Sequence, residues 1–129
     1  MRVVCFGTFD VFHKGHEHYL RSAKAFGELW AIVALDETVL KVKGRSARNC
    51  QDKRLAVISD LDFVDHAILG NPGDKYDIIE KIKPDVICLG YDQEAFVDKL
   101  EGELKKRGLN AVVKRIDSYE PHVYKSSLL

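Results

Sequence analysis

The chain has 129 residues, a length that suits one domain with a hydrophobic core and leaves little room for a second. Twenty Lys and Arg side chains balance twenty Asp and Glu side chains, so no overall field attracts nucleic acid or an anionic membrane surface. No apolar segment approaches the roughly 20 residues of a membrane-spanning helix, and the first residues lead straight into a strand-like pattern without a cleavable signal. We therefore expect one domain over residues 1–129, with neither nucleic acid nor a membrane as partner.

The cysteines indicate the redox environment. Cys5, Cys50 and Cys88 are odd in number, and none belongs to a C-x-x-C pair. This usage argues against a disulfide scaffold and against a zinc site. A cytoplasmic protein with reduced thiols is the expectation.

The predicted elements begin with the apolar run Arg2–Phe6, which is continuous rather than alternating, as in a strand covered on both faces. The polar segment Gly7–His16 follows, and helical periodicity then runs over Gly15–Phe26. A second strand is predicted over Leu29–Leu35. The side chains expected to face the core from the first helix are Tyr19, Leu20, Ala23 and Phe26.

The basic segment Lys41–Cys50 comes next, and its Gly, Ser and Asn residues and low apolar content indicate a loop. It carries four cations, Lys41, Lys43, Arg45 and Arg48. Helices and strands then alternate to the end of the pattern: helix Gln51–Leu61, strand His66–Gly70, helix Asp74–Lys83, strand Asp85–Gly90, helix Ala95–Arg107 and strand Asn110–Arg115.

This alternation predicts an α/β fold: a single Rossmann-like domain with a doubly wound, five-stranded parallel sheet of order 3-2-1-4-5. In such a sheet the winding reverses between the first and fourth strands, and ligands bind there, outside the carboxyl ends of the strands. The polar segments Gly7–His16 and Gly90–Gln93 follow those two strands. They are therefore expected to flank the ligand.

The segment "GTFDVFHKGH" matches neither common phosphate-binding loop, G-x-x-x-x-G-K-[ST] or G-x-G-x-x-G. It nevertheless suits an anion. Gly7 lets the backbone approach a ligand, and His13 and His16 flank Gly15 where a helix begins, so unpaired N–H groups and two imidazoles face the same region. Imidazole N–H groups can donate to phosphate oxygens as negative charge builds up.

The same segment resembles the H-x-G-H signature of the nucleotidyltransferase superfamily related to cytidylyltransferases, here His13-Lys14-Gly15-His16 after Gly7-Thr8-Phe9-Asp10. The stretch "LGYDQ", Leu89 to Gln93, is similar to a signature of archaeal-type FAD synthases. The resemblance implies FMN adenylyltransferase activity, in which ATP and FMN give FAD and pyrophosphate. Two alternatives stay open: nucleotidyl transfer to glycerol 3-phosphate or a sugar phosphate, and a nucleotide-binding module without catalysis.

The resemblance also implies roles for individual residues. His13 and His16 would contact the α- and β-phosphates, Lys43 would draw in the FMN phosphate, and Arg54 would hold the leaving pyrophosphate. Nucleotide-binding roles are implied for Thr8, Phe9, His13, Lys14, Gly15, His16, Asp92 and Tyr119, with Lys14 to His16 acting through the backbone. From the residues alone, Phe9 could equally be a core residue and Asp10 could fix a turn.

The expected cofactor is Mg²⁺, which bridges the phosphates and is ligated by phosphate and water, so no protein metal ligands are assigned. Relatives are often dimers, which makes a homodimer one of the expectations. Relatives also usually open a final helix with a Ser/Thr-rich stretch that caps the triphosphate. Here "YKSSLL", residues 124–129, supplies Ser126 and Ser127 for that position, and two alternatives stay open: the helix is absent, or the sequence stops short of it.

Overall fold

A computed structural model describes residues 1–71, 76–90 and 97–116. Five parallel strands form one sheet in the order β3-β2-β1-β4-β5, as the sequence predicts. The strands are β1 Arg2–Gly7, β2 Glu28–Val33, β3 His66–Leu69, β4 Val86–Gly90 and β5 Val112–Ile116. The winding therefore reverses between β1 and β4, where this architecture places a ligand.

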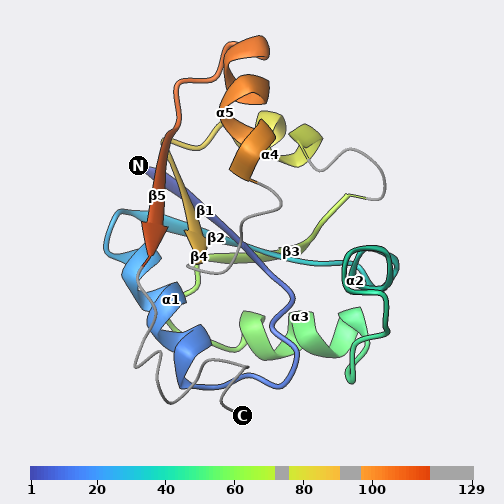
Figure 1. The fold of residues 1–129 in the computed structure, drawn as a ribbon. Coiled ribbons are helices and arrows are strands. Elements are labelled where there is room, and N and C mark those ends of the chain that lie inside the picture. Colours follow the sequence, from blue (N-terminus) through green and yellow to red (C-terminus); the bar gives the residue numbers. More distant parts are fainter. Residues whose placement is uncertain (72–75, 91–96, 117–129) are drawn as a thin grey trace.

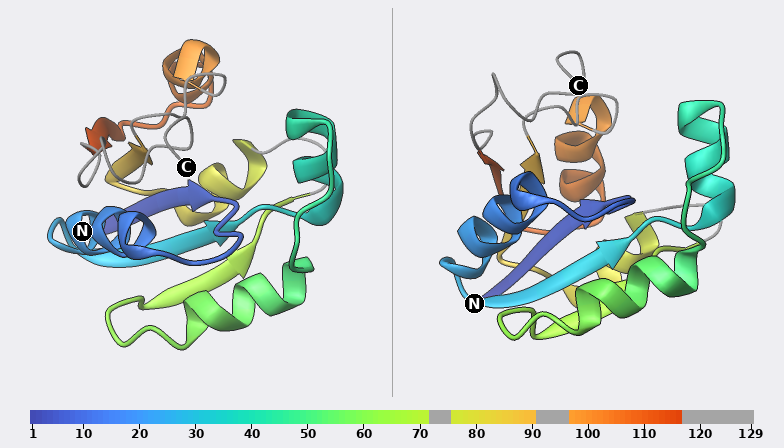
Figure 2. Two further views of the ribbon diagram at one scale, coloured as in Figure 1. Left: turned by 60° about the horizontal axis from the view of Figure 1, so that its bottom comes forward. Right: turned by 90° about the horizontal axis from the view of Figure 1, so that it is seen from below.

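Helices cover both faces of the sheet (Figures 1 and 2). The helices are α1 Lys14–Lys24, α2 Asp36–Lys43, α3 Gln51–Ser59, α4 Tyr76–Ile82 and α5 Val97–Lys106. One face buries Leu20 of α1 and Ile58 of α3, and the other buries Ile79 of α4 and Leu100 of α5. Because both faces are buried, the strands consist of continuous apolar runs. None of the helices in the described ranges combines the length and apolar character needed to cross a bilayer.

Helix α2 is the main difference from the prediction, which ended the second strand at Leu35 and began a loop at Lys41. The structure ends β2 at Val33, and the helix continues to Lys43 before Gly44 terminates it with φ 72°. The signals were present in the sequence: acidic residues in the first turn, basic residues in the last turn and a glycine after it. The expected loop is confirmed only after Lys43.

Two smaller expectations concern individual side chains. The prediction that Phe26 faces the core is wrong, because α1 ends at Lys24 and the Phe26 ring is 39% exposed. All three cysteines are free, as expected: Cys5 and Cys88 are buried opposite each other in β1 and β4, and Cys50 is exposed.

Strands β1 and β4 separate at the point where the ligand site begins. Their pairing runs from Val3–Val86 to Cys5–Cys88, whereas β1 pairs with β2 as far as Gly7–Val33. The hydroxyl of Tyr19 fills the fork: it accepts a hydrogen bond from the Phe6 N–H at 3.2 Å and donates to the Cys88 carbonyl at 2.8 Å. A side chain of α1 therefore satisfies backbone groups that strand pairing would otherwise satisfy.

Replacing Tyr19 by Phe tests this bridge. The substitution keeps the ring and removes the hydroxyl that bonds the Phe6 N–H and the buried Cys88 carbonyl, so we expect a loss of about 1–3 kcal/mol in the free energy of unfolding. Urea unfolding measures it, with an unchanged m-value as the control for an intact native state. Wild-type stability in Tyr19→Phe would contradict the bridge.

Candidate functional site

His13 and His16 form a pair at the start of α1. His13 is the N-cap with extended backbone, and its Nδ1 accepts a hydrogen bond from the Gly15 N–H at 3.0 Å. His16 Nδ1 accepts in turn from the His13 N–H at 3.3 Å, which completes a reciprocal capping box. The two rings stack with centroids 3.8 Å apart and an interplanar angle of 18°. The helix start therefore holds both imidazoles in one orientation.

Gly15 is required by this geometry, which explains the glycine of the H-x-G-H motif. A Cβ at this position would lie 2.8 Å from the Cε1 atom of His13. The His13 ring covers the glycine, so any side chain there would displace the ring.

The hydrogen bonds also assign the tautomers. A neutral imidazole whose Nδ1 accepts a hydrogen bond carries its proton on Nε2. Burial, followed by the nearby charges of His13 and Lys43, lowers the pKa of His16 to about 4, against a smaller opposing effect of Asp10. His16 is therefore neutral at pH 7, and both rings present Nε2–H groups as donors to an anionic ligand.

The ring of Phe9 packs against the imidazole pair through His16. The Phe9 ring is 3% exposed and meets the His16 ring edge-on, with centroids 5.5 Å apart. A Cβ on Gly7 would lie 2.5 Å from the same ring, so Gly7 provides space for it. The structure thus assigns the Phe9 ring to the core, and a nucleotide contact through its backbone stays a prediction.

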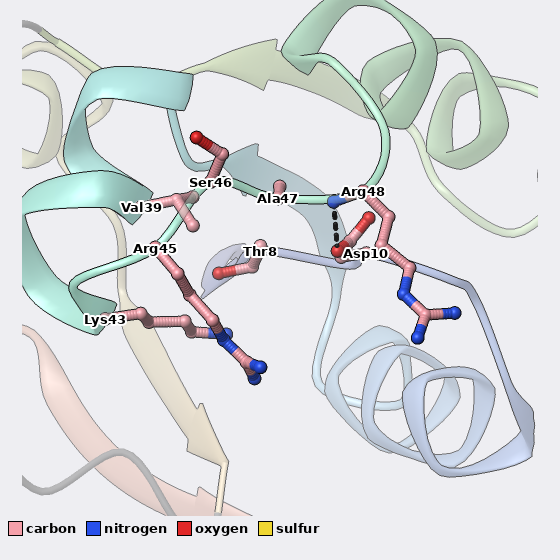
Figure 3. Close-up of a pocket in the computed structure, with 8 residues that line it drawn as sticks. All are labelled: Thr8, Asp10, Val39, Lys43, Arg45, Ser46, Ala47 and Arg48. Carbon is pink, nitrogen blue, oxygen red and sulfur yellow. Dashed lines mark hydrogen bonds between the residues drawn. The ribbon is translucent and has the colours of Figure 1, made fainter.

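A cationic pocket lies beside the motif loop (Figure 3). Its volume is about 320 Å³, and the side chains of Lys43 and Arg45 extend in the same direction from α2 and the segment after it. The charge of Lys43 contributes to the low pKa of His16, so the pocket and the imidazole pair are electrostatically coupled parts of one site. The residues that line the pocket are Thr8, Asp10, Val39, Lys43, Arg45, Ser46, Ala47 and Arg48.

Arg54 lies inside the protein instead of in the pocket. Its side chain has no exposed surface, and it donates to the carbonyl oxygens of Thr8 at 2.9 Å and Ala34 at 2.7 Å. It also donates to the Asn49 carbonyl at 2.9 Å and to the Asp36 carboxylate at 2.7 Å. The expected direct contact between Arg54 and pyrophosphate does not fit this geometry, because protein oxygens already surround the guanidinium.

The structure places the other predicted site residues in the pocket, at the start of α1 or outside the described residues. Thr8 and Lys43 meet in the pocket, and His13, Gly15 and His16 meet at the helix start. Lys14 is the first residue of α1 and is exposed. Asp92 and Tyr119 lie outside the described residues, as do Ser126 and Ser127, so their roles stay predictions.

Some pocket residues were not assigned a role from the sequence. Arg45 and Arg48 entered the prediction only as cations of the same basic segment as Lys43, and the structure places all three around one cavity. Their clustering in one short basic segment was the available signal.

The site offers no cage of protein ligands for a metal. Among the described residues, no group of three or more His, Cys, Asp or Glu side chains is arranged to hold an ion. Both carboxylate oxygens of Asp10 accept hydrogen bonds from the chain itself. Mg²⁺ would fit this site through phosphate oxygens and water, which it retains readily.

Comparison with known proteins gives close relatives. Residues 4–129 match the cytidylyltransferase-like family. The FAD synthase of Pyrococcus horikoshii is 45% identical over 127 residues, which cover 97% of this chain and 83% of that protein. The FAD synthase of Methanoregula boonei is 48% identical over 120 residues, which cover 92% of this chain and 80% of that protein.

Solved structures share the fold. A crystal structure of the lipopolysaccharide core biosynthesis protein from Thermoplasma volcanium has a TM-score of 0.87 and 40% identity, covering 93% of this chain and 98% of that one. The pantoate-beta-alanine ligase of Francisella tularensis has a TM-score of 0.66 at 13% identity, covering 92% of this chain and 60% of that one. The second likeness concerns the fold alone.

The protonation of His16 can be measured directly. We expect the Hε1 chemical shift of His16 to titrate with a midpoint near pH 4, because burial and neighbouring cations disfavour the imidazolium. The pKa is lower in the folded state than in the unfolded state, so the protein loses stability as the pH falls from about 6.5 to about 4. A His16→Gln variant should lose less stability over this range, and a midpoint at 6.5 would contradict the buried, neutral donor.

Proposed function

The chain belongs to the cytidylyltransferase-like family, and we propose that it is an FAD synthase, an enzyme that transfers the AMP group of ATP to FMN. The observation that carries the proposal is the stacked imidazole pair at the start of α1, beside a cationic pocket. Identity of 45% to an FAD synthase along nearly the whole chain supports the choice of substrates.

The reaction requires positioning and charge stabilisation. A phosphate oxygen of FMN attacks the α-phosphorus of ATP and forms the new P–O bond, while the bond from that phosphorus to the oxygen bridging to the β-phosphate breaks. Pyrophosphate leaves with the electron pair. The Nε2–H groups of His13 and His16 donate to the α- and β-phosphate oxygens on which negative charge increases.

The cationic pocket binds phosphate. Lys43, Arg45 and Arg48 keep their charge at neutral pH, and the hydroxyl of Thr8 adds a donor. Lys43 draws in the phosphate of FMN, and Thr8 contacts the triphosphate. The Lys and Arg side chains of the pocket thus bind the phosphate charge that exists before the reaction. The imidazole N–H groups bind the negative charge that develops on the phosphate oxygens during it.

Thr8 and the start of α1 would hold Mg²⁺ indirectly, through the phosphates that they bind, and the ion would neutralise part of the charge of the triphosphate. As part of the same proposal, the enzyme is a single domain in the cytoplasm, where its free thiols stay reduced.

A different acceptor is the second candidate. The structural relative from Thermoplasma volcanium is named as a lipopolysaccharide core biosynthesis protein. This name favours sugar phosphates as the acceptors to compare with FMN in the assay. A pocket of Lys and Arg side chains selects a phosphate without selecting the group attached to it.

The decisive experiment incubates the protein with ATP, FMN and Mg²⁺ and measures FAD and pyrophosphate. Parallel reactions replace ATP by CTP, and FMN by glycerol 3-phosphate or a sugar phosphate. Formation of FAD at a higher kcat/KM than any other product supports the proposal. Turnover only with another acceptor would assign the second candidate, and nucleotide binding without turnover on any acceptor would indicate a non-catalytic module.

Substitution of the imidazoles tests the mechanism. We expect His13→Ala and His16→Ala each to lower kcat by about 10²–10³-fold, the usual effect of removing a donor from developing charge. His18→Ala, also on α1 but outside the stacked pair, is the matched control and should retain activity. Full activity in His16→Ala would refute the role assigned to the pair.

Gly15→Ala tests ring placement without removing an imidazole. The new Cβ displaces the His13 ring, so we expect kcat to fall by about tenfold to a hundredfold with little change in melting temperature. Gly102→Ala is the control, since its Cβ meets open space on α5 and alanine favours a helix. Equal activities of the two variants would show that His13 needs no fixed position.

A further inference from the structure

Asp10 lies in the motif loop and binds the basic segment on the other side of the pocket. One carboxylate oxygen accepts from the Arg48 N–H at 2.8 Å. The other accepts from the Asn49 N–H at 3.0 Å and from the Asn49 side-chain amide at 3.3 Å. Segments 38 residues apart are thus joined through backbone N–H groups.

Arg54 holds Asn49 from the opposite side. Its Nε donates to the Asn49 carbonyl, and its Nη1 donates to the Thr8 carbonyl, both at 2.9 Å. Asn49 therefore binds Asp10 through its N–H groups and Arg54 through its carbonyl. We call these three residues, Asp10, Asn49 and Arg54, the clamp.

We propose that Asp10 is a positioning residue. Its carboxylate, through the clamp, fixes the part of the basic segment that lines the pocket, residues 43–48, and so sets the affinity for the acceptor phosphate. This inference rests on the proposed function for the identity of the acceptor. Asp10 itself contacts neither substrate nor metal in this role.

The surroundings of Asp10 favour positioning over metal ligation. Each oxygen already accepts a backbone N–H, and no group of three or more His, Cys, Asp or Glu side chains among the described residues could hold a metal ion with it. Partial burial alone would raise the pKa of Asp10, but the N–H groups of Arg48 and Asn49, with the charges of Arg54 and Lys43, lower it. The carboxylate is therefore ionised at neutral pH.

The positioning role also explains why a negatively charged residue lines a pocket for phosphate. Asp10 lines a pocket built from Lys43, Arg45 and Arg48, where a carboxylate repels a phosphate. Electrostatics alone would favour a neutral residue there. The three cations repel one another, and Gly44 ends the helix between Lys43 and Arg45, so the segment that follows needs an anchor at its far end. Asp10 provides that anchor.

The loop backbone directs Asp10 toward the segment. Both flanking residues, Phe9 and Val11, have φ of 53°, a left-handed conformation that is unfavourable for non-glycine residues. The buried ring of Phe9 and the hydrogen bonds of Asp10 hold this conformation in place.

Asp10→Asn distinguishes positioning from charge. The amide is nearly the same size, but its NH₂ group faces an N–H donor that the carboxylate accepted. We expect KM for FMN to rise about tenfold or more, the usual effect of losing hydrogen bonds to a charged group, with kcat within about twofold of the wild type. Removal of negative charge alone would lower that KM.

Two further variants serve as comparisons. Asp10→Glu keeps the charge and changes the reach, so it should also raise KM for FMN. Asp52→Asn removes one negative charge from the exposed first turn of α3 and should leave KM unchanged. A KM for FMN in Asp10→Asn that equals or falls below the wild-type value would overturn the positioning role.

Hydrogen exchange tests the clamp without any assay of FAD formation. The amides of Arg48 and Asn49 should exchange about tenfold or more faster in Asp10→Asn than in the wild type, and at wild-type rates in Asp52→Asn. Unchanged exchange in Asp10→Asn would overturn the clamp whatever the activity. If the exchange behaves as expected but the wild type forms no FAD, the clamp is supported and the proposed function fails.

Discussion

The guanidinium of Arg54 connects the segments that meet at the carboxyl-terminal edge of the sheet. It binds carbonyl oxygens from the ends of β1 and β2 and from the segment before α3, and it forms an ion pair with Asp36 at the start of α2. Burying a charge is costly unless it is paired and fully hydrogen-bonded, and these oxygens meet that requirement. The arrangement of the loops around the site depends on this residue.

The site that results separates two kinds of positive character. Arginine and lysine side chains line the pocket, whereas the imidazoles at the start of α1 present N–H donors and His16 is neutral at pH 7. The two are physically related, since the charge of Lys43 helps to keep His16 unprotonated. Under the proposed function, the pocket attracts the anionic substrate and the imidazoles orient it.

Much of the architecture could be predicted because it follows from local patterns. Continuous apolar runs predicted strands buried on both faces, and the alternation with helices predicted the sheet order and the position of the site between β1 and β4. Helix α2 was missed although its charge pattern and Gly44 were visible, because the basic composition of its end suggested a loop. Arg54 was assigned to pyrophosphate because the resemblance implies that role, and the sequence gives no sign that its neighbours bury it.

The sequence alone determined the strand order, the reversal of winding where a ligand is expected, and the placement of His13 and His16 at the start of a helix, because periodicity and short motifs depend on residues close in the chain. Only the tertiary structure showed that Tyr19 fills the fork between β1 and β4, that Asp10 binds Asn49, and that Arg54 is buried. Tyr19 and Cys88 lie 69 positions apart, Asp10 and Asn49 lie 39 apart, and Arg54 binds Thr8 46 positions away, so these contacts depend on the direction and burial of single side chains. Such features are set by packing between elements, which no local pattern contains.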